Sequence, residues 1–156
     1  IFGCNLKCIM CPGNRPTKRP KGIMPMAMFT GIIDSLAPYR DKIDMMDLYC
    51  LGEPLLDPHI FDRIRYVKAA GFRNVAISTN ADLLDILKQR QLLDSGIDTV
   101  LFSIDGINKK THEDIRKGAN FERVVANCES IIKMRDAGNW TSNGCAAKIH
   151  STPLNS

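Results

Sequence analysis

Short apolar runs alternate along this chain with longer segments in which apolar residues recur every three or four positions. The runs at 45–51, 74–79 and 99–104 are typical of buried strands. The segments between and after them have the period of amphipathic helices. Counting the capping residues that can be recognised, the expected helices cover 28–36, 57–71, 83–95, 111–117 and 120–138.

Polar residues and glycines mark the ends of these helices. Asp57 precedes Pro58, as expected for an N-cap followed by the first helical position, and Gly71 follows the last apolar position. Asn120 is expected to cap the last helix, and Gly138 to end it. The pattern therefore predicts helices with defined ends.

Strands that alternate with helices predict parallel βα units joined by right-handed crossovers. A complete eight-unit barrel uses roughly 250 residues, so a closed barrel of that kind does not fit into 156 residues. About five units are expected, the first ending at Phe2 and the fifth with a strand at 148–155 in an otherwise unassigned tail from 139 to 156. In such folds the reactive groups lie at the carboxyl ends of the strands.

Composition is that of one ordinary domain, residues 1–156. The chain is 44% hydrophobic and 24% charged, which excludes a disordered chain. No run of 18 apolar residues is present, so no membrane span is expected. The net charge of +4 is mild and forms no long block, so no nucleic-acid partner is expected. Because the chain begins at Ile1 rather than Met, we expect that the native N-terminus is missing.

Three of the six cysteines, Cys4, Cys8 and Cys11, form a CxxxCxxC pattern within eight residues. A disulfide framework is disfavoured because an odd trio on one loop pairs badly. A structural zinc site would need a fourth ligand, for which Cys50 and His59 are candidates. A redox-active C-x-x-C pair would leave Cys4 without a role. The fourth interpretation is a 4Fe-4S cluster held by three thiolates, with one iron free to bind a substrate or cofactor.

The cysteine pattern resembles the signature of the radical S-adenosylmethionine (radical SAM) superfamily, and three further motifs support the resemblance. Residues 51–54 (LGEP) resemble the GGEP motif of that family, and residues 78–80 (STN) resemble its STNG motif. Residues 103–106 (SIDG) end the next expected strand, and the resemblance continues through Arg116 to about Gly138. The chain is most similar to the subgroup that often carries a C-terminal SPASM domain.

The resemblance implies an α/β fold, a partial (β/α)6 TIM-like barrel of which this chain is a truncated core. It implies that Cys4, Cys8 and Cys11 hold the cluster and that the open iron binds the methionine part of S-adenosylmethionine. It assigns no catalytic side chain. The residues expected to bind the cofactor are Gly52, Glu53, Ser78, Asn80, Ser103 and Arg116.

The same resemblance implies a reaction: reductive cleavage of S-adenosylmethionine gives a 5′-deoxyadenosyl radical, which abstracts hydrogen from a peptide, protein, sugar or cofactor precursor. The implied partners are this substrate and an electron donor such as flavodoxin or ferredoxin. A reducing compartment, the cytoplasm, is expected. The alternative is a non-catalytic zinc- or cluster-binding domain.

Some residues depart from the family pattern or have no place in it. Leu51 and Ala81 replace family glycines beside the inferred cofactor contacts, which makes the local backbone geometry there an open question. Cys50, Cys128 and Cys145 match no expected ligand. Cys128 lies on an apolar helical stripe and is expected in the core.

Overall fold

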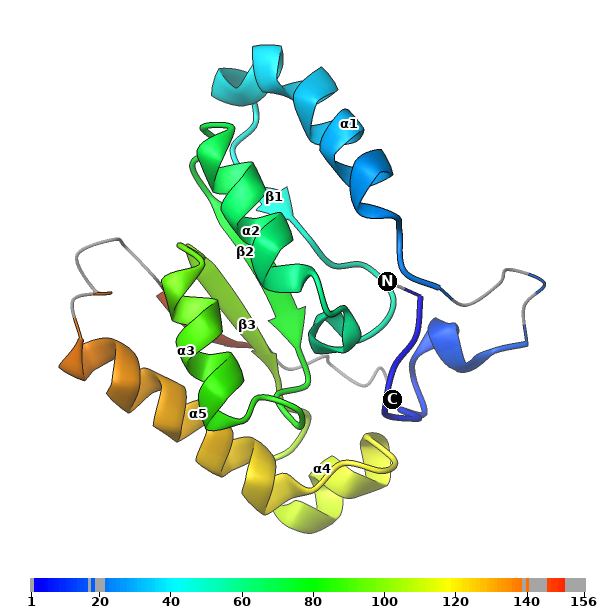
Figure 1. Ribbon diagram of the computed structural model, residues 1–156. Helices are drawn as coiled ribbons and strands as arrows, with labels where there is room; N and C mark the ends of the chain where they lie inside the picture. The colour runs from blue at the N-terminus through cyan, green and yellow to red at the C-terminus, as the bar shows by residue number, and fades with distance from the viewer. Residues whose placement is uncertain (1, 17, 19–21, 139, 141–145, 151–156) are drawn as a thin grey trace.

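The computed structural model describes residues 2–16, 18, 22–138, 140 and 146–150. Within this part of the chain the strands form one four-stranded parallel sheet in the order β1-β2-β3-β4 (Figure 1). The strands are β1 (Met46–Asp47), β2 (Val75–Thr79), β3 (Thr99–Ser103) and β4 (Ala146–His150). The predicted alternation of strands and helices in a parallel sheet is confirmed.

Helices α2 to α5 connect successive strands on one side of the sheet, and α1 precedes the first strand. Helices α2 and α3 lie against the same face, and α5 packs beside α3 (Figure 1). The helices are α1 (Met26–Leu36), α2 (Ile60–Ala69), α3 (Ile86–Asp94), α4 (Lys109–Ile115) and α5 (Phe121–Ala137). Short 3-10 turns occur at Pro12–Asn14, Ala37–Lys42 and Pro54–Leu56.

The core lies between the sheet and these helices. Strand β2 is almost entirely buried, and Val75, Ala76 and Ile77 have no exposed surface. Ile64 of α2, Leu92 of α3 and Val124 of α5 fill the space above it. Strands that are buried along their length read as continuous apolar runs rather than as alternating ones. This explains why β2 and β3 were predicted almost to the residue.

The predicted strand at 45–51 is much shorter than expected. Only Met46 and Asp47 pair with β2, and the last ladder bond runs from the Leu48 N–H to the Ala76 carbonyl. The chain then bends away, and Gly52 adopts a φ of +123° that other residues rarely adopt. The rest of the apolar run at 45–51 therefore forms a loop at the edge of the sheet instead of pairing with β2.

The predicted ends of α2, α3 and α4 are also wrong by two or three residues, because side-chain caps lie elsewhere. Helix α2 begins after His59, since Asp57 accepts the His59 N–H in the preceding turn. Asp85 caps α3 by accepting the Lys88 N–H, so that helix begins at Ile86. Asn108 caps α4. By contrast, Asn120 caps α5 as predicted.

The two ends of the chain also differ from expectation. Phe2 forms an isolated antiparallel bridge with Gly22 rather than a strand in the sheet. The last predicted strand exists, but it covers Ala146–His150, and residues 151–155 lie outside the described part of the chain. Its parallel register pairs Leu101 with Lys148.

Among the described residues, no helix is long and apolar enough to cross a membrane.

A buried ion pair anchors α2 to the loop before it. The Arg63 Nε lies 2.9 Å from the Asp57 carboxylate, and both side chains are about 95% buried, with exposed fractions of 5% and 4%. The guanidinium also donates to the Met24 carbonyl and lies 4.8 Å above the centre of the Phe29 ring. Arg63 thus connects α2 to the start of α1.

We expect Asp57→Ala to lower the free energy of unfolding by about 3–5 kcal/mol, because the substitution leaves the buried Arg63 charge unpaired. Urea denaturation followed by circular dichroism measures the loss. The matched control is Asp62→Ala, which removes an exposed pair with Arg65 and should cost at most about 1 kcal/mol. Equal losses in the two variants would contradict a special role for the buried pair.

Candidate functional site

A cavity of about 350 Å³ opens at the carboxyl ends of β2 and β3. The residues that line it come from the N-terminal loop, the loop after β1, the two strand ends and the end of α4. All nine residues that the sequence singled out are among them: Cys4, Cys8, Cys11, Gly52, Glu53, Ser78, Asn80, Ser103 and Arg116. Met10, Pro12, Tyr49, Cys50 and Leu51 complete the lining.

The cysteine loop is fixed to α4 by its backbone. The N–H groups of Lys7 and Ile9 donate to the carbonyls of Lys117 and Ile115, at 2.8 and 2.9 Å. Leu6, which is only 1% exposed, anchors the loop from below. These bonds fix the loop to the carbonyls at and just after the end of α4, which ends at Ile115 rather than at the predicted residue 117.

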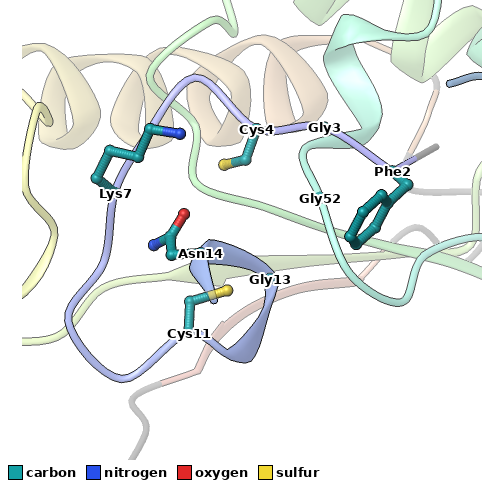
Figure 2. A pocket seen from close by; sticks show the side chains of 8 residues that line it. All are labelled: Phe2, Gly3, Cys4, Lys7, Cys11, Gly13, Asn14 and Gly52. Carbon is teal, nitrogen blue, oxygen red and sulfur yellow. The ribbon is translucent and has the colours of Figure 1, made fainter. Parts of the chain in front are cut away.

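The thiols face the space enclosed by this loop. Figure 2 shows the sulfurs of Cys4 and Cys11 directed into the gap between the loop and the turn at Gly13, with the Lys7 amine on the same side as Cys4. Burial raises the pKa of the Cys4 and Cys8 thiols, and the Arg116 charge opposes that effect at Cys8. The Arg116 Nη1 lies 3.9 Å from the Cys8 sulfur.

The donor set allows a test of which metal group fits. Within the described residues, no three His, Cys, Asp or Glu side chains converge closely enough to hold one metal ion. A 4Fe-4S cluster binds each cysteine through a different iron, so its thiols lie around the cluster rather than at one point. Cys4, Cys8 and Cys11 line one cavity, and thiolates are the usual ligands of such clusters, so this donor set fits one.

Glu53 lies beneath the cavity and is only 1% exposed. Its carboxylate accepts the Thr79 hydroxyl at 2.7 Å and the backbone N–H groups of Asn80 and Leu55 at 2.8 and 3.1 Å. Burial raises the pKa of this carboxyl, and the three hydrogen bonds oppose that shift. All three partners are donors, which favours the ionised form. Glu53 thus places a carboxyl group held by three hydrogen-bond donors under the site.

The two serines at the strand ends lie side by side. The hydroxyl oxygens of Ser78 on β2 and Ser103 on β3 are 3.1 Å apart, and both side chains line the cavity. Gly52 faces them from the loop after β1. Its φ of +123° requires glycine, so the backbone there has no Cβ between it and the cavity.

Asn80 holds the cysteine loop to the end of β2. Its amide nitrogen donates to the Asn5 side chain at 2.9 Å and lies 3.8 Å from the Cys4 sulfur. Its amide oxygen accepts the Asp82 N–H. The next residue, Ala81, replaces a family glycine and has a φ of +59°, in the left-handed region that favours glycine.

Sequence reasoning missed several residues that support the site. Asp82 binds the Asn5 amide at 3.1 Å and pairs with Arg123 of α5 at 2.6 Å. Asp105 pairs with the buried Arg116 at 2.7 Å. Asp105 lies in the SIDG motif at the end of a strand, and this position is the signal that could have identified it as a site residue. No comparable pattern marks Asn5 or Asp82.

His112 is a further buried group near the site. The side chain has no exposed surface, and neither ring nitrogen has a hydrogen-bond partner in the described part of the chain. Burial lowers the pKa of the imidazole, and the Arg116 charge lowers it further. The ring is therefore neutral, and it packs against Phe121.

The remaining cysteines lie in different environments. Cys50 is exposed and lines the cavity, whereas Cys128 is buried in the core as predicted. Burial raises the pKa of Cys128 to about 12, so this thiol stays protonated at neutral pH. His59, the other candidate for a fourth zinc ligand, is exposed at the start of α2. Cys145 lies outside the described residues.

Comparison with known proteins agrees with this geometry. The AdoMet-dependent heme synthase of Methanosarcina barkeri is 35% identical over 133 residues, which are 84% of this chain and 37% of that protein. The tungsten-containing aldehyde ferredoxin oxidoreductase cofactor-modifying protein of Pyrococcus furiosus is 31% identical over 85% of this chain and 36% of its own length. The chain thus spans little more than a third of the length of these relatives.

Solved structures share the fold. Streptococcus suis SuiB bound to its precursor peptide SuiA superimposes with a TM-score of 0.71 at 17% identity, over 96% of this chain and 30% of that one. The structure of anSMEcpe with bound AdoMet gives a TM-score of 0.70 at 20% identity, over 96% and 40% of the two chains. The fold is therefore the partial barrel that the motifs predicted.

A family description, that of the Radical SAM superfamily, matches residues 1–142. This match covers every cavity residue and most of the chain. With the three thiols, the strand-end serines and the glycine turn around one cavity, the chain belongs to the radical SAM superfamily, whose enzymes use a 4Fe-4S cluster and S-adenosylmethionine.

Proposed function

We propose that this chain is the cofactor-binding core of a radical SAM enzyme, in which Cys4, Cys8 and Cys11 hold the cluster. The observation that supports this most strongly is the single cavity lined by all nine expected residues, which lie up to 112 positions apart in the sequence. A structural metal site would not need serine hydroxyls, a glycine turn and a buried arginine around the same space. The cofactor supplies the radical chemistry, and the chain supplies binding and orientation.

Each side chain has a proposed part in binding S-adenosylmethionine. The Arg116 guanidinium, whose Nε has no partner among the described residues, is suited to the carboxylate of the methionine part. Ser78 and Ser103 offer hydroxyls that can donate to the carboxylate or the ribose. Gly52 leaves its backbone open to the cofactor's ammonium group, and the Glu53 charge below favours that cation.

Asn80 has a different proposed role from the one its motif suggested. Its amide oxygen and nitrogen are already bonded to the Asp82 N–H and the Asn5 side chain. It therefore acts through the cysteine loop, by holding Cys4 over the end of β2. A residue that positions a ligand in this way is part of the site's geometry without touching the cofactor.

The substrate class remains part of the proposal. SuiB is a relative in fold that was solved with a precursor peptide, and the sequence relatives include a heme synthase. A peptide or a cofactor precursor is accordingly the substrate class that we favour for the whole protein. The cavity of about 350 Å³ is lined in part by the exposed Cys50, so an extended substrate can approach it from solvent.

Metal analysis tests the proposal directly. After anaerobic reconstitution the chain should hold about four irons, and its reduced electron paramagnetic resonance spectrum should change when S-adenosylmethionine is added. A change in the spectrum reports cofactor binding at the open iron. One tightly bound zinc with no response to S-adenosylmethionine would instead support a non-catalytic metal-binding domain.

The cysteine assignment predicts a sharp difference between two buried thiols. Cys8→Ala should remove the bound cluster, because Cys8 faces the cavity beside Arg116. Cys128→Ala should leave iron content unchanged, because that thiol lies in the core of α5 and stays protonated. Iron and sulfide assays measure both. Similar iron loss in the two variants would show that unfolding, not ligation, controls the cluster.

Ser103 provides a test of cofactor binding that spares the cluster. Ser103→Ala should weaken S-adenosylmethionine binding by about 10–150-fold, the value of one hydrogen bond to a charged group. The matched control is Ser130→Ala, which removes a hydroxyl that bonds Gln89 between α3 and α5. Anaerobic calorimetry on cluster-loaded protein gives the dissociation constants. Unchanged affinity in Ser103→Ala would remove that serine from the site.

A further inference from the structure

Arg116 occupies a fixed place opposite Cys8. The N–H groups of the two residues that flank Cys8 donate to the carbonyls of the two residues that flank Arg116, at 2.8 and 2.9 Å. The Arg116 N–H itself donates to the His112 carbonyl at 2.7 Å. The backbone therefore brings the Arg116 side chain beside Cys8, although the two residues are 108 positions apart in the sequence.

The three nitrogens of the Arg116 guanidinium have three different environments. Nη1 donates to the Cys8 sulfur at 3.9 Å, and Nη2 lies 2.7 Å from the Asp105 carboxylate. Nε is buried without a partner among the described residues, and it is the N–H group left for the cofactor carboxylate in the proposed function. The guanidinium therefore has enough donors to bind Cys8 and the cofactor at the same time.

The ion pair that holds this guanidinium is buried. The side chains of Arg116 and Asp105 are 10% and 2% exposed. Separating the pair would leave two unpaired charges out of water, so Asp105 keeps the guanidinium beside the sulfur. Asp105 itself is not among the described residues that line the cavity. In such surroundings a hydrogen bond from a charged donor is stronger than it would be in water.

We infer that Arg116 has a second role besides binding the cofactor: its Nη1 hydrogen bond to Cys8 favours the reduced state of the cluster, and Asp105 is the positioning residue for that bond. The inference rests on the proposed function, because it assigns the cluster to the three cysteines. Reduction adds one negative charge to the cluster, and an N–H donor to a ligand sulfur stabilises that charge. One electron passes from a low-potential reductant, such as a reduced viologen, to the cluster. No bond forms or breaks, and the guanidinium keeps its protons.

The test removes both charges of this pair together. Arg116→Gln with Asp105→Asn keeps the net charge and leaves neither partner as an unpaired buried charge. The matched control is Arg63→Gln with Asp57→Asn, which makes the same change in another buried pair, whose residues do not line the cavity. Redox potentiometry with viologen mediators, followed by electron paramagnetic resonance, gives the midpoint potential of the cluster. Leaving S-adenosylmethionine out of the sample separates this role of Arg116 from cofactor binding.

Reduction of the cluster should be about tenfold less favourable in the Arg116 variant, which lowers the midpoint potential by about 59 mV for one electron, because the ligand sulfur loses its donor. The control should keep the wild-type potential. An unchanged potential in the Arg116 variant would overturn the inference. An equal drop in the control would overturn it too, because loss of any buried ion pair would then explain the shift.

A second measurement uses the wild-type protein and does not depend on whether the variant folds. Arginine labelled with a heavy nitrogen isotope in its guanidinium introduces a nuclear spin, and pulsed electron paramagnetic resonance detects its coupling to the reduced cluster. We expect this coupling in the wild type and in the Arg63 control, and its loss in the Arg116 variant. No coupling in the wild type, or a coupling that persists in the Arg116 variant, would overturn the inference. Iron content is measured first, so that a chain that holds no cluster, which would refute the proposed function, is recognised separately.

Discussion

The buried carboxylate of Glu53 is the interaction on which the rest of the site depends. It joins three segments that are distant in the sequence. Its side chain accepts from Thr79 and Asn80 at the end of β2 and from Leu55 in its own loop. Its backbone N–H donates to the Gly3 carbonyl at 2.8 Å, immediately before Cys4. One residue thus fixes the loop after β1, the end of β2 and the start of the cysteine loop relative to one another. If Glu53 were removed, these buried N–H and O–H donors would lose their hydrogen bonds, and the free energy of desolvating them would not be offset.

A second set of contacts closes the site from the other side. Asp82 joins Asn5 to Arg123 of α5, while Arg116 joins Asp105 to the neighbourhood of Cys8. The cysteine loop is therefore held between the strand ends and the α4–α5 region. Burial of the thiols disfavours their ionised form, whereas the Arg116 charge and nearby N–H donors favour it. Binding of a metal group would add to these effects, because it stabilises the ionised form of the three thiols.

Much of this arrangement could be predicted from the sequence, because its signals are local. The buried strands β2 and β3 are continuous apolar runs, and Asn120 precedes α5 as an N-cap. Of the nine predicted cavity residues, five lie at or just after strand ends, where parallel sheets gather them, and the three cysteines lie in one loop motif. The predictions were wrong where contacts between distant segments determine the start of a helix. Asp57 reads as an N-cap, but its carboxylate is engaged by the buried Arg63. Likewise, Leu84 continues a helical stripe in the sequence but is fully buried in a loop before the Asp85 cap.

Two of the residues that escaped prediction act through partners far away in the sequence. Asn5 and Asp82 are 77 positions apart, and Asp82 and Arg123 are 41 positions apart. A polar residue alone in a loop has many possible roles, and only the fold selects one. The charge distribution is a contrasting case, because it needs no long-range contact to be read. Arg15 and Lys18 have no acidic neighbour in the sequence before Asp34, and neither forms an ion pair within the described residues. Surface charge near the cysteine loop is thus a property of the sequence itself, while the geometry of the cavity below it belongs to the fold.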